Sequence, residues 1–526
     1  MNRLITSVIC GLVGINTMLS ADPSRPRLVV GIMVDQLRTD YIEYLQGLFG
    51  EKGFRRLMKD GAFLKDVDFK VPGLDKVSGT ALIYTGGYPR HNGVTAAMKY
   101  DPARQDMVPS LNDPSIIGNF TSETYSPSGL RFSTISDEVA IDGAGLGMVY
   151  SIAPDPQQSI IMAGHAGNSA FWINENTGRW ATSTYYKDAP ALLTQRNYSN
   201  PVSSRIDTMV WKPALPISRY PGLPAQKRQF DFKHTFPTSD RSVYRMYASS
   251  PLVNTEITDV AVMYLKDLKI GQRGDAIDML NIGYTAAPYK YVKDGDYRLE
   301  LEDSYVRLDG QLSRLFEAID KYVGLDNTLI YVASTGYYDD SVEDDSKYRI
   351  PSGMFSVKRA LSLLNSYLVA RYGNGDYVDT YSKGHVYLDR KKIEEKKLNL
   401  EEVAAAARDF LVKMSGVSDA YTMGDIMTSA LPSMEALRLG TDPKTGGDVV
   451  LDFNSGWTVV DDTRFPNDTQ VIRSAMVQTP VFILAPSIEP AVISTTVDAT
   501  AIAPTVSSIL RIRSPNGSAS KPLLLK

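Results

Sequence analysis

Short apolar runs alternate with amphipathic segments along this chain. Continuous apolar runs occupy residues 28–34, 328–333 and 480–484, and they are typical of strands buried on both faces of a parallel sheet. Apolar residues recur every three or four positions over residues 40–57 and 305–322, which predicts helices with one buried face. Strands that alternate with such helices predict an α/β fold with a doubly wound, mostly parallel sheet.

Two segments interrupt this alternation and predict insertions into the core. Residues 166–260 are rich in Trp, Tyr, Pro and Asn, and we interpret them as an insertion or cap. Residues 340–450 form the second predicted insertion, with helices expected near 357–369 and 401–414. The core is therefore expected in three parts, at residues 22–165, 261–339 and 451–526.

The start of the chain is typical of a secretory signal peptide, which we expect to be cleaved after Ala21. Arg3 precedes an apolar stretch over residues 4–19, and glycines and polar residues interrupt that stretch too often for a membrane span. Cleavage removes the only cysteine, Cys10, which excludes disulfides and thiolate catalysis from the mature protein. We therefore expect an exported bacterial protein without a transmembrane segment, in the periplasm or associated with the outer membrane or cell surface.

Composition narrows the function classes further. Hydrophobic residues make up 43% of the 526 residues and charged residues 22%, which is ordinary for a globular protein. The 56 Lys and Arg are outnumbered by 60 Asp and Glu, so the basic excess of a nucleic-acid-binding protein is missing. We therefore expect no nucleic-acid partner.

Several segments, in order along the chain, carry a family resemblance. Residues 27–41 read RLVVGIMVDQLRTDY, and residues 84–89 read YTGGYP. They are followed by residues 171–178 (FWINENTG), 302–309 (EDSYVRLD) and 515–517 (PNG). These segments resemble the alkaline phosphatase superfamily, in particular the periplasmic, phosphate-irrepressible alkaline phosphatases and their phosphodiesterase/nucleotide pyrophosphatase relatives. The resemblance spans nearly the whole chain after the signal peptide and implies the same doubly wound fold.

The resemblance also implies a catalytic site in which two zinc ions, held by three Asp and three His, lie beside a Thr or Ser nucleophile. Asp35, at the end of the first predicted strand, matches the first carboxylate ligand, and it is the only ligand that carries over. The other positions of the site hold different residues: Asp75 or Lys76 at the nucleophile, Pro288 and Val292 at one Asp–His pair, Ser334 and Thr335 at a second, and Thr469 at the last His. We therefore expect the family's fold without its two-zinc cofactor.

The chain has only four histidines, and none falls at a ligand position of the family. Zinc sites of this kind need imidazole ligands held in defined orientations. We interpret His165 as a structural imidazole, and His91, His234 and His385 as turn or surface residues.

Our leading hypothesis is a non-catalytic binding or scaffold subunit of the bacterial envelope, with another envelope protein or complex as its partner. A buried carboxylate at the end of a strand needs a polar partner, and Lys76 is the candidate that the sequence offers to Asp35. Such a pair would take the place of the lost metal ions.

Two alternatives stay open. The first is a phosphate or sulfate ester hydrolase with a rearranged site, in which Ser78 or Thr80 supplies the nucleophile. Its metal ion would be held by Asp35 and by the acidic cluster that contains Asp339 and Asp340. The second alternative is a carbohydrate or small-ligand binding protein that uses the cleft between the core and its caps. Metal content separates the leading hypothesis from the first alternative.

Overall fold

The computed structural model describes residues 25–224, 226, 230–274, 276–293, 295–339, 351–461, 463, 468–472 and 477–525. The expected signal peptide and Asp340 lie outside these residues. No helix in the described ranges is both long and apolar enough to cross a lipid bilayer.

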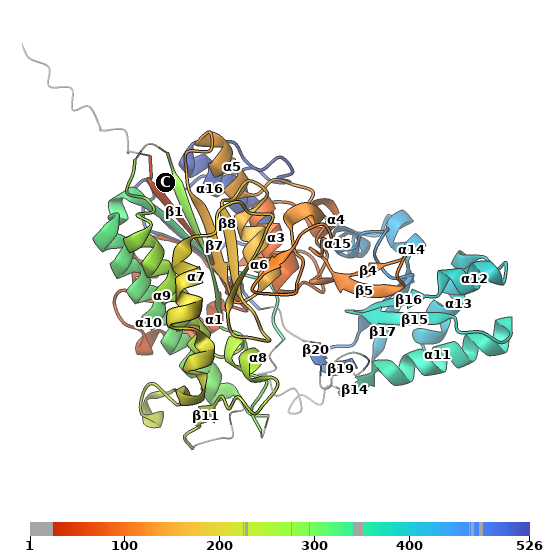
Figure 1. Cartoon of the computed structure of the whole chain (residues 1–526). Coiled ribbons are helices and arrows are strands. Elements are labelled where there is room, and N and C mark those ends of the chain that lie inside the picture. The colour runs from red at the N-terminus through yellow and green to blue at the C-terminus, as the bar shows by residue number, and fades with distance from the viewer. Residues whose placement is uncertain are drawn as a thin grey trace, which may run out of the picture.

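A ten-stranded sheet forms the centre of the molecule (Figure 1). In spatial order its strands are β22 (Ala491–Ile493), β2 (Ala62–Leu64), β21 (Val481–Leu484), β13 (Thr328–Ser334), β1 (Leu28–Asp35), β12 (Asp278–Thr285), β7 (Val149–Ala153), β8 (Ser169–Ile173), β9 (Trp180–Ser183) and β6 (Gly118–Asn119). The five strands from β13 to β8 are parallel, and antiparallel pairs flank them on both sides. This arrangement confirms the predicted α/β fold with a mostly parallel sheet.

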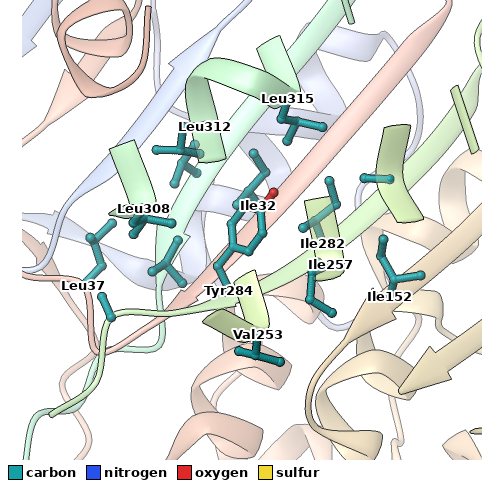
Figure 2. Packing of buried hydrophobic residues seen from close by; sticks show 14 of the residues in the cluster. Ile32, Leu37, Ile152, Val253, Ile257, Ile282, Tyr284, Leu308, Leu312 and Leu315 are labelled. Atoms are coloured by element: carbon teal, nitrogen blue, oxygen red, sulfur yellow. The ribbon is translucent and has the colours of Figure 1, made fainter. Parts of the chain in front are cut away.

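Helices cover one face of the sheet through a continuous apolar interface. Figure 2 shows Ile32 of β1 and Ile282 of β12 facing Leu308, Leu312 and Leu315, which repeat at helical spacing. All five side chains are fully buried. The two longest helices of this face are α9 (Leu252–Asp267) and α10 (Arg298–Tyr322).

The predicted helix over residues 40–57 is divided in the structure. It consists of α1 (Thr39–Leu45), the 3₁₀ turn η1 (Gln46–Leu48) and α2 (Phe54–Asp60). The Asp309 carboxylate of α10 accepts hydrogen bonds from the Gly50 amide (2.8 Å) and from the first amide of α2 (2.7 Å). The prediction of one helix was wrong because this long-range contact, which local periodicity does not report, holds the chain in a turn.

The opposite face of the sheet is covered by a second group of helices. Val29 and Met33 of β1 point to this face, since successive side chains of a strand alternate between its two sides. The helices here are α3 (Lys76–Thr85), α5 (Ile135–Asp142), α6 (Pro156–Ala163) and α16 (Ile502–Leu510).

A small lobe, residues 353–472, stands beside this core with a hydrophobic core of its own (Figure 1). One of its sheets has the order β14 (Gly353–Ser356), β19 (Trp457–Asp461) and β20 (Asp468–Val471), and the other has β15 (Val378–Ser382), β16 (His385–Leu388), β18 (Val449–Phe453) and β17 (Val417–Thr422). Its helices are α11 (Val357–Tyr372), α12 (Arg390–Glu395), α13 (Leu400–Leu411), α14 (Met423–Thr428) and α15 (Ser433–Gly440). The predicted boundary at residue 450 was wrong, because β19 and β20 beyond it complete a sheet of this lobe.

The first predicted insertion begins later than residue 166. The strands β8 and β9 lie beyond that position and belong to the central sheet, with Trp172 and Trp180 buried inside it. The prediction assigned these tryptophans to a cap, but their side chains pack in the core. The true departure from the sheet follows β9 and contains α7 (Ala191–Ser199), β10 (Val210–Trp211), β11 (His234–Thr235) and α8 (Val243–Ala248).

The remaining short elements connect these parts. A hairpin of β4 (Met98–Asp101) and β5 (Asp106–Pro109) reaches the small lobe, where Tyr100 stacks on Tyr387 at a centroid distance of 4.6 Å. The others are α4 (Pro89–Asn92), β3 (Val67–Asp68), β23 (Val497–Asp498), η2 (Pro127–Gly129), η3 (Val202–Ser204), η4 (Ile206–Thr208), η5 (Ile217–Arg219), η6 (Leu325–Asn327) and η8 (Ala499–Ala501).

Candidate functional site

The carboxyl ends of three parallel strands meet at one edge of the sheet, where α/β folds of this type place their ligands. Asp35 ends β1 and lies opposite Thr285, the last residue of β12. The Asp35 side chain is almost completely buried, and its Oδ1 accepts a hydrogen bond from the Thr335 hydroxyl (3.1 Å), just beyond β13. Asp35 is therefore a fixed, desolvated carboxylate at the centre of the site.

Lys76, the first residue of α3, supplies the charge that balances Asp35. Its Nζ lies 3.3 Å from Asp35 Oδ2, which confirms the predicted contact. Gly79 brings the helix this close, because a Cβ there would overlap the carbonyl oxygen of Thr335. The lysine thus enters the site from the start of a helix that rests directly on the strand ends.

Burial and charge act in opposite directions on this pair. Burial raises the pKa of Asp35, the ammonium of Lys76 lowers it, and the nearby Asp339 carboxylate raises it again. Burial alone would lower the pKa of Lys76, but the carboxylates of Asp35 and Asp155 more than offset this effect and raise it. Lys76 is therefore a permanent cation at neutral pH.

Asp75, which with Lys76 is one of the two residues at the expected nucleophile position, is the N-cap of α3. Its Oδ1 accepts hydrogen bonds from the amides of Val77 (3.1 Å) and Ser78 (3.0 Å), and its Oδ2 accepts one from the Ala97 amide (2.7 Å). Lys383 Nζ of the small lobe lies 3.4 Å from the same Oδ2. Burial raises the pKa of Asp75, but Lys383 and these amides outweigh that effect and lower it overall.

The two candidate nucleophiles, Ser78 and Thr80, are both fully buried and engaged inside α3. The Ser78 hydroxyl lies 3.0 Å from Asp75 Oδ1 and also accepts the Asp75 amide, which completes a capping box. The Thr80 hydroxyl donates to the Lys76 carbonyl (2.6 Å). Both hydroxyls therefore stabilise the helix, and neither is presented to a cavity.

Asp339, the described member of the predicted acidic cluster, also faces a lysine. Its Oδ2 lies 2.6 Å from Lys290 Nζ, whereas its Oδ1 is buried without a hydrogen bond within the described part of the chain. Lys290 lies between Pro288 and Val292, the two positions where the resemblance implies an Asp and a His. A lysine of this segment thus lies against the Asp339 carboxylate.

Ser334 and Thr335, at the positions where the resemblance implies a second Asp–His pair, are both fully buried. Thr335 bonds Asp35 as described, and its hydroxyl also accepts the Gln36 amide (3.0 Å). Neither side chain is an Asp or His, so neither restores a zinc ligand of the family's kind.

A cavity of about 840 Å³ opens beside these groups, between the core and the small lobe. Core residues that line it include Asp75, Lys290 and Asp339, and the small lobe contributes Lys383 and Thr469. Thr469, the position expected to replace the last His, therefore faces the site region even though it belongs to the small lobe.

The residues present do not fit a pair of zinc ions. Across the described ranges, no three His, Cys, Asp or Glu side chains form a group that could hold a metal ion. A two-zinc site requires several carboxylate and imidazole ligands around each metal, whereas Asp35, Asp75 and Asp339 each face a lysine ammonium. We refer to these three contacts as the lysine–carboxylate pairs.

The histidines lie apart from the strand-end site. His91 is exposed, and His165 bridges Asp137 Oδ2 (3.1 Å) and the Leu130 carbonyl (3.0 Å), as a structural imidazole does. The hydrogen bond that His165 donates to the Asp137 carboxylate raises the pKa of His165, although partial burial lowers it.

The interpretation of two other histidines as turn or surface residues was wrong. His234 begins β11, contacts the Trp211 ring and lies 2.8 Å from the buried carboxylate of Glu300. His385 begins β16, where its Nδ1 accepts the Gly447 amide, and burial lowers its pKa to about 4. Both histidines lie in strands and contact residues that are distant in the sequence, and the sequence pattern around a histidine does not reveal such contacts.

Sequence reasoning missed Lys290 and Lys383 as members of the site. Lys290 could have been predicted as a site residue, because it lies inside a segment where the resemblance implies two metal ligands. Lys383 could not have been predicted, because it reaches Asp75 from a loop of the small lobe more than 300 residues away along the chain.

The chain belongs to the type I phosphodiesterase / nucleotide pyrophosphatase family, whose family model matches residues 29–471. This match, together with the fold, confirms the resemblance to the alkaline phosphatase superfamily. Among curated proteins, the chain is 27% identical to the alkaline phosphatase PafA of Elizabethkingia meningoseptica over 538 residues, which cover 98% of each chain. It is 26% identical to the alkaline phosphatase PhoV of Synechococcus elongatus over 520 residues, covering 95% of this chain and 92% of that protein.

The crystal structure of wild-type PafA has the same architecture. It matches with a TM-score of 0.82 at 27% sequence identity, covering 95% of this chain and 98% of that one. Both the core and the small lobe therefore belong to a fold shared with an alkaline phosphatase.

Proposed function

We propose that this chain is a non-catalytic member of its family, which works as a binding or scaffold subunit in the bacterial envelope. The observation that carries the proposal is the set of lysine–carboxylate pairs at the strand ends, with N–O distances of 3.3, 3.4 and 2.6 Å. An ammonium group balances carboxylate charge as a zinc ion does. It has no open coordination position, however, and it cannot polarise a phosphoryl oxygen as a Lewis acid or activate water.

The nucleophile position supports the same proposal. The resemblance puts it at Asp75 or Lys76; Asp75 is a helix cap, and Lys76 pairs with Asp35. The Ser78 hydroxyl bonds Asp75, and the Thr80 hydroxyl bonds the Lys76 carbonyl and the Gln158 amide. A nucleophile needs an activating base or metal and access to substrate, and the buried Ser78 and Thr80 hydroxyls lack that access.

The expected signal peptide supports an envelope location for this subunit, in the periplasm or at the cell surface. We propose another envelope protein or complex as the partner. Exposed aromatic side chains such as Tyr198 (72% exposed) and Phe230 (79% exposed) are available for such contacts.

A second candidate function is a phosphate or sulfate ester hydrolase with a rearranged metal site. The names of two relatives, both alkaline phosphatases, favour it. So does the proximity of Asp35 and Asp339, whose charges are close enough to raise the pKa of Asp35. In that case Lys76 and Lys290 would have to move away for a metal ion to bind.

Metal content and hydrolysis decide between these functions. We expect purified and dialysed full-length protein to hold far less than one zinc ion per chain by elemental analysis. Hydrolysis of aryl phosphate mono- and diesters with added Zn²⁺ should stay at background, whereas a working catalyst lowers the barrier by about 8–23 kcal/mol. About two zinc ions per chain would overturn the proposal.

Variants of α3 separate a nucleophile from a structural hydroxyl. Ser78→Ala and Thr80→Ala should change stability but no hydrolysis rate, because both hydroxyls bond only within the fold. Thr85→Ala is the matched control, since its buried hydroxyl bonds the Ala81 carbonyl at the other end of the helix. A hydrolysis rate that Ser78→Ala or Thr80→Ala abolishes, and Thr85→Ala preserves, would establish the second candidate.

A further inference from the structure

Among the described residues that line the cavity between the core and the small lobe, acidic side chains outnumber basic ones. Three lysines line it, namely Lys70, Lys290 and Lys383, together with five aspartates, namely Asp66, Asp68, Asp75, Asp339 and Asp461. At neutral pH this is a net charge of about −2 on the described lining residues.

The three lysines are each committed to a carboxylate. Lys290 and Lys383 belong to the lysine–carboxylate pairs, and Lys70 Nζ lies 2.6 Å from Asp498 Oδ2. Their charges are therefore balanced before any ligand enters the cavity.

Three of the five aspartates have no ion-pair partner among the described residues. Asp66 accepts only the Thr496 hydroxyl (2.6 Å), and Asp68 accepts the backbone amide of Lys70 (2.8 Å). Asp461, on the opposite wall, accepts the amide of Thr463 (3.1 Å). Asp68 also helps to raise the pKa of Lys70 through its charge. Aspartates outside the lysine–carboxylate pairs thus line the cavity from both the core and the small lobe.

Aromatic rings supply a second kind of attraction for cations. Tyr337, Tyr338 and Tyr381 all line the cavity. Two of these rings already lie near a cation of the protein, with Lys383 Nζ 5.8 Å from the Tyr337 centroid and the Arg38 guanidinium 5.7 Å from that of Tyr338. The faces of such rings attract ammonium groups through their quadrupole.

We infer that this cavity binds a small organic polycation, an amine with two or more ammonium groups. Its volume of about 840 Å³ lies in the range of small-molecule sites, and the aspartates outside the lysine–carboxylate pairs lie on two walls, where separated ammonium groups can meet them. The same charge repels phosphate and sulfate esters. The inference rests on the proposed non-catalytic function, because bound zinc ions would reverse the sign of the charge in this region.

Isothermal titration of the full-length protein with spermidine, and separately with inorganic phosphate, tests the inference. We expect saturable spermidine binding that weakens several-fold between low and physiological salt, because exposed charges are screened. We expect no saturable binding of phosphate. Phosphate binding tighter than spermidine binding, or no spermidine binding at all, would overturn the inference.

A paired variant locates the binding site. Asp66→Asn with Asp461→Asn keeps both hydrogen-bond acceptors and removes two charges, so spermidine affinity should fall about two- to thirtyfold. Asp320→Asn, an exposed change on α10, is the matched control and should leave the affinity unchanged. Equal affinity in all three proteins would overturn the assignment to this cavity.

A cavity-filling change keeps the test independent of the aspartates. Thr469→Trp on β20 leaves the charge unchanged and fills part of the cavity, so it should also weaken spermidine binding. Zinc analysis of the same sample separates the two proposals. If the protein is zinc-free and inactive and does not bind spermidine, only this inference is wrong. If it holds two zinc ions per chain, the proposed function is wrong as well.

Discussion

At the scale of single residues, the pair of Asp35 and Lys76 shows how a buried carboxylate is stabilised at the ends of the central strands. The Asp35 side chain is 4% exposed, and the Lys76 side chain is 29% exposed. The cost of taking the carboxylate out of water is offset by the ammonium and by the Thr335 hydroxyl. The charge balance of the site thus depends on a lysine that a metal-binding site would have to exclude.

Replacing Lys76 with Met should therefore destabilise the protein by about 3–5 kcal/mol at most, because it leaves Asp35 buried and unpaired. Urea denaturation at neutral pH measures the change. Lys52→Met is the matched control, since its pair with Glu317 is half exposed and such pairs contribute about 0–1 kcal/mol. An equal effect of the two variants would show that the pairing of Asp35 contributes little.

The pH dependence of the Lys76→Met variant follows from the pKa of Asp35. Burial already raises that pKa, and loss of the lysine raises it further. A carboxyl whose pKa is higher in the folded than in the unfolded state costs stability when it is ionised, so its cost grows as pH rises through the folded pKa. The deficit of Lys76→Met should be largest at neutral pH and shrink on acidification, and a deficit independent of pH would contradict this account.

At the scale of elements, α3 is held in place by its cap. Asp75 accepts three backbone amides, two from the first turn of the helix and one from Ala97 on a neighbouring loop. Asp75 therefore fixes the helix that brings Lys76 to Asp35.

Asp75→Ala should cost about 1–2 kcal/mol through loss of the cap, whereas Asp75→Asn should cost less, because the amide oxygen still accepts. Urea denaturation of both variants measures the difference. Lys383→Met removes the ion pair and keeps the cap, so it isolates the electrostatic part. Equal costs for Ala and Asn would show that the charge of Asp75, rather than its cap, holds α3.

Elements that are buried on both faces could be predicted from sequence, and elements defined by contacts between distant segments could not. Residues 28–34 read as a strand because every position is apolar, and all eight residues of β1 are buried. The helices α11 and α13 also lie where they were predicted, because apolar residues repeat along one face of each helix. The boundary at residue 450 failed because β19 joins the small lobe through its pairing with β14, about 100 residues earlier in the chain.

In the candidate site, too, one contact could be predicted from the sequence and another could not. The pairing of Asp35 with Lys76 could be predicted, because the family resemblance places both residues in one site and a buried carboxylate needs a polar partner. The pairing of Asp75 with Lys383 could not be predicted, because it depends on how the small lobe lies against the core.

At the scale of the whole molecule, two separately packed parts share the candidate cavity. The core packs its helices on both faces of the central sheet, and the small lobe has its own cluster of buried side chains. Polar contacts such as the pair of Arg131 and Asp442 join the two parts, in addition to the stacking of Tyr100 on Tyr387. Interfaces of this kind are weaker than a shared hydrophobic core, so the parts can unfold separately.

Calorimetry of the full-length protein should therefore show two transitions, and the pH dependence of one of them should depend on His385. Burial lowers the pKa of His385 to about 4, while its unfolded value is 6.5. A histidine with a depressed pKa contributes stability that is present above pH 6.5 and is lost as pH falls toward its folded pKa. Acidification from pH 7.5 to pH 5 should destabilise the small lobe by about 1–2 kcal/mol through this group, because the unfolded histidine takes up a proton that the folded one resists. His385→Gln should remove that difference from the transition of the small lobe and leave the transition of the core unchanged.

Two results would contradict this account. A single transition at both pH values would show that the two parts unfold together. The same pH dependence in His385→Gln would show that another group controls the acid response.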